Sequence, residues 1–428
     1  MSQALSNTLT HVRHYRQAID ALLLYGGVFD TAVGQTFLTL LEALENQLAG
    51  PSLRAYSHWF QALATAEQTW VSYLQRQIAY ADNAFTQQVQ RSGLERLPQA
   101  LVQAARQDLV QLQWLHNLEP AQVSQWVQVV GNLTTPPIAW AIDPPKPPFQ
   151  FEPHGSWAEA LPTLAQHYQQ HGVGKLAQYR AFTWQQGELW GIPDPDPIQL
   201  SQLTAYDHPR QQLIQNTQAL LQGYPALNVL LYGSRGAGKS SLVKALVNEY
   251  APQGLRLVEV AKTELHHLPQ IVERLRSAPQ TFIIFVDDLS FEEDDDAFKA
   301  LKVVLEGSVT ARPPNMAVYA TSNRRHLVRE YFSDRPRPSD QDEIQAWDTL
   351  QEKLSFSDRF GLTLTFEPAD QPTYLVIVQH LAQQAGLTLP QEELTAKALQ
   401  WATRHNGRSG RTARQFIDWL RAEAALAQ

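Results

Sequence analysis

The chain has 428 residues, of which 44% are hydrophobic and 18% are Asp, Glu, Lys or Arg, as in a folded globular protein of two or three domains. Its 34 basic and 42 acidic residues give a formal net charge of −8, which argues against a protein that coats DNA or anionic membranes through its overall field. There are no cysteines, which excludes disulfides, thiolate metal sites, iron–sulfur clusters and cysteine nucleophiles.

The N-terminus lacks the apolar run of a signal peptide, and the apolar runs 20–25 and 282–286 are far shorter than a membrane span of about 20 residues. We therefore expect a soluble, cytoplasmic protein without membrane contact.

Residues 1–133 are predicted to form an all-helical domain. Apolar side chains recur every three to four residues between Tyr56 and Val89, after Pro51-Ser52 and before Ser92-Gly93. A second helix is expected over residues 35–48. Trp59, beside the first stripe, could face a partner, although the core of a bundle is the better place for an aromatic ring.

Residues 134–197 are predicted to connect this domain to the rest of the chain. The segment 134–153 is rich in proline, which cannot continue a helix and favours a semi-rigid extended linker, with docking to a partner as the alternative. Residues 156–190 suggest a helix followed by a short strand or loop, and the break IPDPDP (192–197) precedes the next domain.

From residue 198 to 368, short apolar runs alternate with helical patterns, which predicts an α/β core with a five-stranded parallel sheet covered by helices on both faces. The expected strands are 228–232, 255–260, 281–286, 316–321 and 362–366.

A glycine-rich loop follows the first of these strands and precedes a helical run. It matches G-x-x-x-x-G-K-[ST], the phosphate-binding P-loop (Walker A). Backbone N–H groups of such a loop surround phosphate oxygens, with Lys239 reaching the β- and γ-phosphates and Ser240 coordinating Mg²⁺. The predicted nucleotide-binding residues of the loop are Gly233, Ser234, Arg235, Gly236, Ala237, Gly238, Lys239, Ser240 and Ser241.

Two carboxylates end the buried strand FIIFV, at the edge of the sheet where the P-loop also emerges. Asp287 is the predicted Mg²⁺-holding residue (Walker B), and Asp288 the residue that orients the attacking water. Many ATPases of this architecture carry Glu at the second position. Glu292 and Glu293 are alternative bases, although the run 292–296 also fits a solvated acidic loop.

Asn323 follows the next strand and is expected to face the γ-phosphate and the water, or else to be an ordinary turn residue. Arg359, before the last strand, is expected to reach a neighbouring subunit's site, with a local ion pair to Asp358 as the alternative. Arg408, Arg411 and Arg414 stand where a helix is expected to begin, and one of them could lie above the phosphates, or all could be exposed residues of a helix cap. Arg411 is the first choice, and Arg414 is a second nucleotide-binding candidate.

This order of motifs resembles an AAA+ ATPase. The segment 196–420 is similar to the prokaryotic DUF815 family of uncharacterised AAA+ ATP-binding proteins, on the phrases NVLLYGSRGAGKSSLVKAL, FIIFVDDLSFEEDDDAFKALKVVLEG, YATSNRRHLVREYFSD, EKLSFSDRFGLTLTF and GRSGRTARQFIDWL. The resemblance implies a helical lid over residues 369–428, ATP and Mg²⁺ as ligands, and nucleotide held between subunits of a homo-oligomer. It also implies an adenine pocket near 203–206 and the helix around Leu213.

The leading functional hypothesis is an AAA+ ATPase that remodels or loads an unknown macromolecule, which the N-terminal domain recognises. The alternative is an ATP-gated switch or scaffold with negligible hydrolysis. A small-molecule kinase leaves the SDRFG motif and the lid unexplained, and a GTPase lacks the N-K-x-D motif. The basic residues at 324, 325, 326, 329, 335 and 337 could track DNA, but a subunit interface facing the acidic run 292–296 is preferred. The polar segment 333–351 is expected to be a surface loop.

Overall fold

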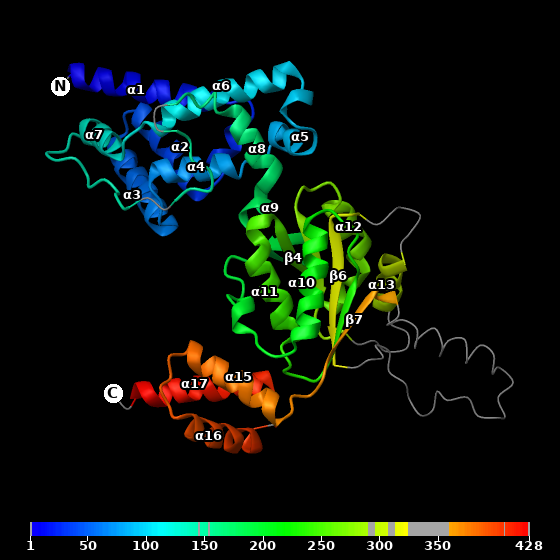
Figure 1. The fold of residues 1–428 in the computed structure, drawn as a ribbon. Coiled ribbons are helices and arrows are strands. Elements are labelled where there is room, and N and C mark those ends of the chain that lie inside the picture. The colour runs from blue at the N-terminus through cyan, green and yellow to red at the C-terminus, as the bar shows by residue number, and fades with distance from the viewer. Residues whose placement is uncertain are drawn as a thin grey trace. The chain divides into compact units, whose positions relative to one another are not determined.

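A computed structural model describes residues 2–143, 146–152, 155–289, 296–306, 313–323, 359–405 and 407–426. The chain divides into two units, Met1–Gln178 and Tyr179–Gln428, which are treated separately below (Figure 1). Within the described ranges, no helix combines the length and hydropathy that a transmembrane span requires.

The first unit is helical. The predicted stretch from Tyr56 to Val89 is divided among three helices, because Glu67 adopts a left-handed backbone (φ 50°) and Thr69 and Asn83 each form a capping box that starts a new helix. The α-helices are α1 (Ser2–Asp20), α2 (Ala32–Glu45), α3 (Ala49–Ala66), α4 (Trp70–Ala79), α5 (Ala84–Ser92), α6 (Gln99–His116), α7 (Pro120–Gly131), α8 (Leu161–His171) and α9 (Gly174–Gln178).

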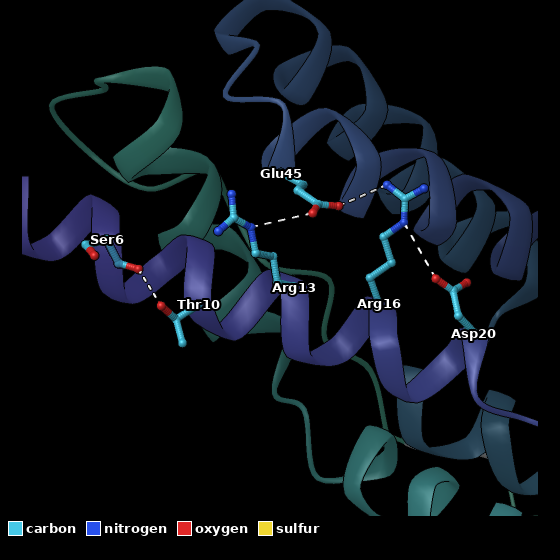
Figure 2. Close-up of polar contacts among 6 residues, drawn as sticks. All are labelled: Ser6, Thr10, Arg13, Arg16, Asp20 and Glu45. Atoms are coloured by element: carbon cyan, nitrogen blue, oxygen red, sulfur yellow. Dashed lines mark hydrogen bonds and ion pairs between the residues drawn. The ribbon is translucent and has the colours of Figure 1, made fainter.

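Aromatic rings fill the core of this unit. Trp59 is 1% exposed and lies 5.5 Å from the ring of Phe37 and 5.8 Å from that of Trp70, so it is a core residue as preferred. At the surface, Figure 2 shows Arg13 and Arg16 of α1 converging on Glu45 of α2, with N–O distances of 3.6 and 3.0 Å. Since these ion pairs are partly exposed, each contributes up to about 1 kcal/mol, and the buried rings dominate the packing.

The predicted connecting segment is split between the two units. Its proline-rich part packs against the helical unit: the Tyr56 hydroxyl donates to the Ile138 carbonyl (2.8 Å), and Trp140 Nε1 donates to the Gln68 carbonyl (3.0 Å). Phe151 is buried and stacks on Trp157 at 3.9 Å. Aromatic residues between the prolines thus attach this segment to the unit that precedes it.

The second unit is built on a seven-stranded sheet in the order β2-β1-β4-β5-β6-β3-β7, in which every neighbouring pair is parallel except β1 and β2. The strands are β1 (Ala181–Gln185), β2 (Glu188–Gly191), β3 (Val229–Gly233), β4 (Leu255–Glu259), β5 (Thr281–Val286), β6 (Met316–Ser322) and β7 (Leu362–Phe366).

The five predicted strands are therefore present, and the sheet is larger than predicted by the hairpin β1–β2. Gln186 and Gly187 connect the hairpin with left-handed backbones (φ 52° and 80°), which is typical of a two-residue turn whose twist matches that of the strands. Trp184 is fully buried, so the hairpin belongs to the core of this unit.

Helices cover the sheet and continue into a C-terminal bundle. Leu213 of α10 and Leu242 of α11 pack with Tyr319 of β6 in one apolar cluster. Three further helices pack around Tyr374 and Phe416 and form the predicted lid. The helices of this unit are α10 (Asp207–Leu221), α11 (Lys239–Tyr250), α12 (Leu268–Leu275), α13 (Asp296–Glu306), α15 (Gln371–Gln384), α16 (Gln391–Arg404) and α17 (Gly410–Leu426).

Candidate nucleotide site

The P-loop joins β3 to α11 through backbone conformations that require glycine. Gly233 has φ 135°, and a Cβ atom there would lie 2.0 Å from the Phe366 carbonyl oxygen of the adjacent strand. Gly236 has φ 75° and passes close to Ser409 and Arg411 at the start of α17. The loop turns tightly at the N-terminus of a 12-residue helix, where backbone N–H groups and the helix dipole favour an anion.

Lys239 is 7% exposed, and its amine forms hydrogen bonds to the loop and to Asn323. Its Nζ donates to the carbonyls of Gly233 (3.0 Å) and Ser234 (2.8 Å) and to Asn323 Oδ1 (3.3 Å). Burial lowers its pKa, and the charges of Asp287 and Asp288 act in the opposite direction. The amine is thus held beside two carboxylates at the mouth of the loop, as the sequence predicts.

The Asp287 carboxylate is joined to the P-loop by a hydrogen bond. Ser240 Oγ donates to Asp287 Oδ1 at 2.7 Å, which brings together the two predicted metal-binding residues. A hydroxyl and a carboxylate are hard oxygen ligands, and Mg²⁺ commonly takes one or two such groups together with phosphates and waters. Ser240 and Asp287 therefore fit a Mg²⁺ ion by the chemistry of their oxygens.

Asp288 adopts a left-handed backbone (φ 50°), which Asp tolerates better than most residues because its short polar side chain can bond locally. Asn323 Nδ2 donates to Asp288 Oδ1 at 2.6 Å. Asn323 therefore connects Lys239, through its amide oxygen, to Asp288, through its amide nitrogen.

The lid approaches the P-loop at the start of α17. The Arg411 backbone N–H donates to the Gly236 carbonyl at 3.2 Å, and Arg411 and Arg414 both line the cavity beside the loop. Arg408 instead donates to Gln371 at 3.3 Å, within the lid. Of these three arginines, the two in the predicted site lie where charges could reach phosphates.

A cavity of about 630 Å³ joins these groups. Leu203, Thr204 and Tyr206, from the segment expected near the base, line this cavity, whereas Leu213 lies in the core of the unit. The cavity residues are Ile198, Gln202, Leu203, Thr204, Tyr206, Arg235, Gly236, Ala237, Gly238, Lys239, Ser240, Ser241, Asp287, Asp288, Thr321, Asn323, Ile377, Leu381, Gly410, Arg411, Arg414 and Gln415.

Arg359 lies at the other end of the sheet. It precedes β7, whose Leu362 pairs with Val229 at the start of β3, whereas Phe366 pairs with Gly233 at the P-loop. Four residues of strand separate the two ends by about 13 Å, more than an arginine side chain spans. Arg359 therefore does not join the site of its own subunit.

Sequence reasoning missed Thr321, Ile377 and Leu381. Ile377 and Leu381 are four residues apart on α15, so both can face the cavity, but the sequence does not show which face of α15 is covered by the lid. Thr321 belongs to the motif ATSN, where its spacing carries no functional signal because threonine is common in strands. Several sequence candidates lie outside the residues whose side chains the structure describes. They are Glu292, Glu293, Asp358, the acidic run 292–296 and the basic and polar residues between 324 and 351.

A family model, described as a protein of unknown function (DUF815), matches residues 177–424. The chain is a member of the DUF815 family. The match covers the whole second unit apart from its last residues, and the helical unit lies outside it except for residues 177 and 178.

Similarity to named proteins is narrower. The chain is 31% identical over 121 residues to the replication factor C large subunit of Staphylothermus marinus, over 26% of this chain and 28% of that protein. It thus spans about a quarter of the length of this curated relative. Among solved structures, the RuvB Holliday junction branch migration motor of Thermotoga maritima has 12% identity and a TM-score of 0.30 (52% of this chain, 72% of that one). AMPPCP-bound DnaA from Aquifex aeolicus has 17% identity and a TM-score of 0.36 (51% and 64%).

The predicted α/β architecture is confirmed: the second unit has a mostly parallel sheet with the P-loop between β3 and α11, it ends in a bundle of three helices, and a helical unit precedes it in the chain.

Proposed function

We propose that this DUF815 protein is a Mg-ATP hydrolase of AAA+ type whose active site is completed by a neighbouring subunit. The supporting observation is the convergence in one cavity of Lys239, the hydrogen-bonded pair Ser240–Asp287, the pair Asp288–Asn323, and the lid residues Arg411 and Arg414. A protein that only binds nucleotide needs the lysine and loop but not the second carboxylate with its asparagine.

Each group has a defined part in the proposed reaction. Lys239 exchanges the carbonyls of its own loop for β- and γ-phosphate oxygens, which carry more negative charge. Asp288 accepts a hydrogen bond from the attacking water through the carboxylate that Asn323 holds in place. Arg411 and Arg414 neutralise charge on the phosphates from the lid. Ser240 and Asp287 would hold Mg²⁺, which would supply electrostatic stabilisation of the ADP leaving group.

The position of Arg359 favours a site shared between subunits. Since it lies at the sheet end opposite the P-loop, an arginine with a catalytic part would act in the next protomer of a head-to-tail assembly. The macromolecular partner, which the helical unit is proposed to recognise, stays unidentified; protein is favoured over DNA, in line with the net charge of −8.

Mixing two inactive variants tests the shared site. Lys239→Ala and Arg359→Ala should each hydrolyse ATP at least tenfold more slowly than the wild type, because each removes a charge that stabilises the transition state. In an equal mixture, about a quarter of interfaces pair an intact P-loop with an intact Arg359, so activity should return to about a quarter of the wild-type rate. Arg408→Ala is the matched arginine control. A mixture that stays as inactive as its parts would contradict a shared site.

The alternative is an ATP-gated switch with negligible turnover. It is favoured by the hydrogen bonds of Asn323 to Lys239 and to Asp288. These bonds occupy the two side chains that hydrolysis would need, as expected of a site that does not turn over. Asp287→Asn distinguishes the two: for a hydrolase, it should lower turnover about a hundredfold while metal-free nucleotide binding persists. If the wild type binds ATP and has no turnover that this substitution can remove, at any protein concentration, the switch is the correct function.

A further inference from the structure

Thr321 contacts both carboxylate residues of the site. It is the penultimate residue of β6 and is 2% exposed. Its hydroxyl lies 2.5 Å from Asp287 Oδ1 and 2.9 Å from the Asp288 backbone nitrogen, and its carbonyl accepts the N–H of Leu289 at 2.7 Å. One residue of β6 therefore holds the three residues that follow β5.

The direction of these hydrogen bonds is fixed by chemistry. The Asp288 nitrogen can only donate, so the threonine oxygen accepts there, and its single hydrogen must point to the Asp287 carboxylate. A hydrogen bond to an ionised carboxylate is about twice as strong as one between neutral groups. The hydroxyl thus has one orientation that satisfies both partners.

For Asp287, the consequence is a fixed carboxylate orientation. Within the described residues, Ser240 Oγ, Thr321 Oγ1 and the Asp288 N–H all donate to the same oxygen, Oδ1, at 2.7, 2.5 and 3.1 Å. With Oδ1 engaged in this way, Oδ2 is the oxygen that would face a metal ion or a water bound to it. Without the threonine hydroxyl, the carboxylate keeps its serine partner but loses the bond that connects it to the neighbouring strand.

For Asp288, the consequence is a stabilised backbone. Asp288 has a left-handed backbone (φ 50°), and a non-glycine residue keeps this conformation where surrounding bonds enforce it. The bond from Asp288 N–H to Thr321 is one such bond, and it holds the conformation in which the carboxylate meets Asn323 Nδ2 at 2.6 Å.

We infer that Thr321 is a positioning residue that sets the metal-side carboxylate of Asp287 and the water-side carboxylate of Asp288 through the two hydrogen bonds of one hydroxyl. The inference rests on the proposed function, since it assigns a residue to that same site. It extends the site to a strand residue that acts through Asp287 and Asp288.

Thr321→Val removes the hydroxyl at nearly constant side-chain shape, whereas Thr321→Ser keeps the hydroxyl and removes the methyl group. The Mn²⁺ concentration that half-saturates the protein–ADP complex is measured by electron paramagnetic resonance. It should be about tenfold higher in the valine variant than in the wild type, and within twofold of the wild type in the serine variant. ADP affinity in EDTA should be unchanged in both. The rate of ATP hydrolysis should fall at least tenfold in the valine variant only.

Thr217→Val is the matched control, because Thr217 is also fully buried and its hydroxyl bonds to Leu213 and Tyr319 away from the cavity. It should lose stability without a change in metal requirement. If Thr321→Val does not fold, Thr321→Ala and Thr321→Ser give the same comparison. Equal metal requirement in the variants with and without the hydroxyl overturns the inference, as does an equal defect in both.

Failure of the proposed function is recognisable separately. If the wild type binds no nucleotide, the function is wrong, and the positioning inference is then decided in the nucleotide-free protein by hydrogen exchange of amides 286–289. Faster exchange is expected in the valine variant than in the serine variant, because the Asp288 N–H loses its acceptor. Identical exchange would overturn the inference.

Discussion

Gly236→Ala should weaken nucleotide binding by an amount that follows from the loop geometry. Gly236 has φ 75°, and an added Cβ would lie 2.9 Å from Ser409 Oγ, 3.1 Å from Ser409 Cβ and 3.2 Å from Arg411 Cβ. An alanine in a left-handed conformation costs about 1–2 kcal/mol. The nucleotide-free loop can relax to a negative φ, so binding must restore the strained form.

That energy corresponds to a loss of affinity of about 5- to 30-fold, and displacement of the start of α17 from the loop can only increase it. Titration of a fluorescent ADP analogue measures the effect. Gly223→Ala is the control, since Gly223 has φ 77° and nothing within 4 Å of its added Cβ, after the end of α10. It carries the same backbone cost away from the site and should lower stability by about 1 kcal/mol without changing affinity.

The reasoning is refuted if Gly236→Ala binds the analogue within twofold of the wild type. It is equally refuted if Gly223→Ala loses as much affinity, because the effect would then be a general loss of stability.

Three further predictions concern other parts of the chain. Burial lowers the pKa of Lys239 in the folded state, so just below pH 10.5 the unfolded chain binds more protons than the folded one. The free energy of unfolding, measured by urea titration, should therefore rise with pH in that range for the wild type relative to Lys239→Met. Asp108→Ala should destabilise the helical unit by about 3 kcal/mol, because this buried carboxylate accepts the N–H groups of residues 23–25, while ADP affinity stays unchanged. Tyr206→Phe removes the bond from this cavity residue to the Glu367 carbonyl (2.7 Å) and should weaken ADP binding about fivefold.

Each of these has a contrary result. Parallel pH curves for the wild type and Lys239→Met would contradict burial as the cause of the lowered pKa. Loss of ADP binding in Asp108→Ala would show that the two units fold together. Unchanged affinity in Tyr206→Phe, with Tyr224→Phe as an exposed control, would show that the bond to residue 367 does not hold the cavity wall.

The sheet and the phosphate loop could be predicted because they depend on local patterns. Uninterrupted apolar runs mark strands buried on both faces, and the run 281–286 matches β5 at both ends. The spacing of Gly233, Gly236, Gly238 and Lys239 in turn dictates a loop that few other sequences can form.

What the sequence did not reveal depends on contacts between distant residues. Whether the segment after residue 180 forms strand or loop is decided by pairing: β1 pairs with β2 to form a hairpin and with β4 to join the sheet. The proline-rich segment is held by Tyr56 and Trp140, whose hydrogen bonds join residues 82 and 72 positions apart. The proposed positioning role of Thr321 depends on its hydrogen bond to Asp287, which follows the neighbouring strand β5, and the spacing within ATSN cannot show that contact.

The hairpin β1–β2 also has a mechanical consequence. The chain enters the second unit through β1, which pairs with β4 over residues 181–183, and β4 lies beside β5, the strand that ends at the Asp287 carboxylate. Tension on the chain at residue 179 is therefore borne first by the few hydrogen bonds between β1 and β4. Those bonds set the largest force that this end of the sheet can carry before the hairpin β1–β2 detaches from β4.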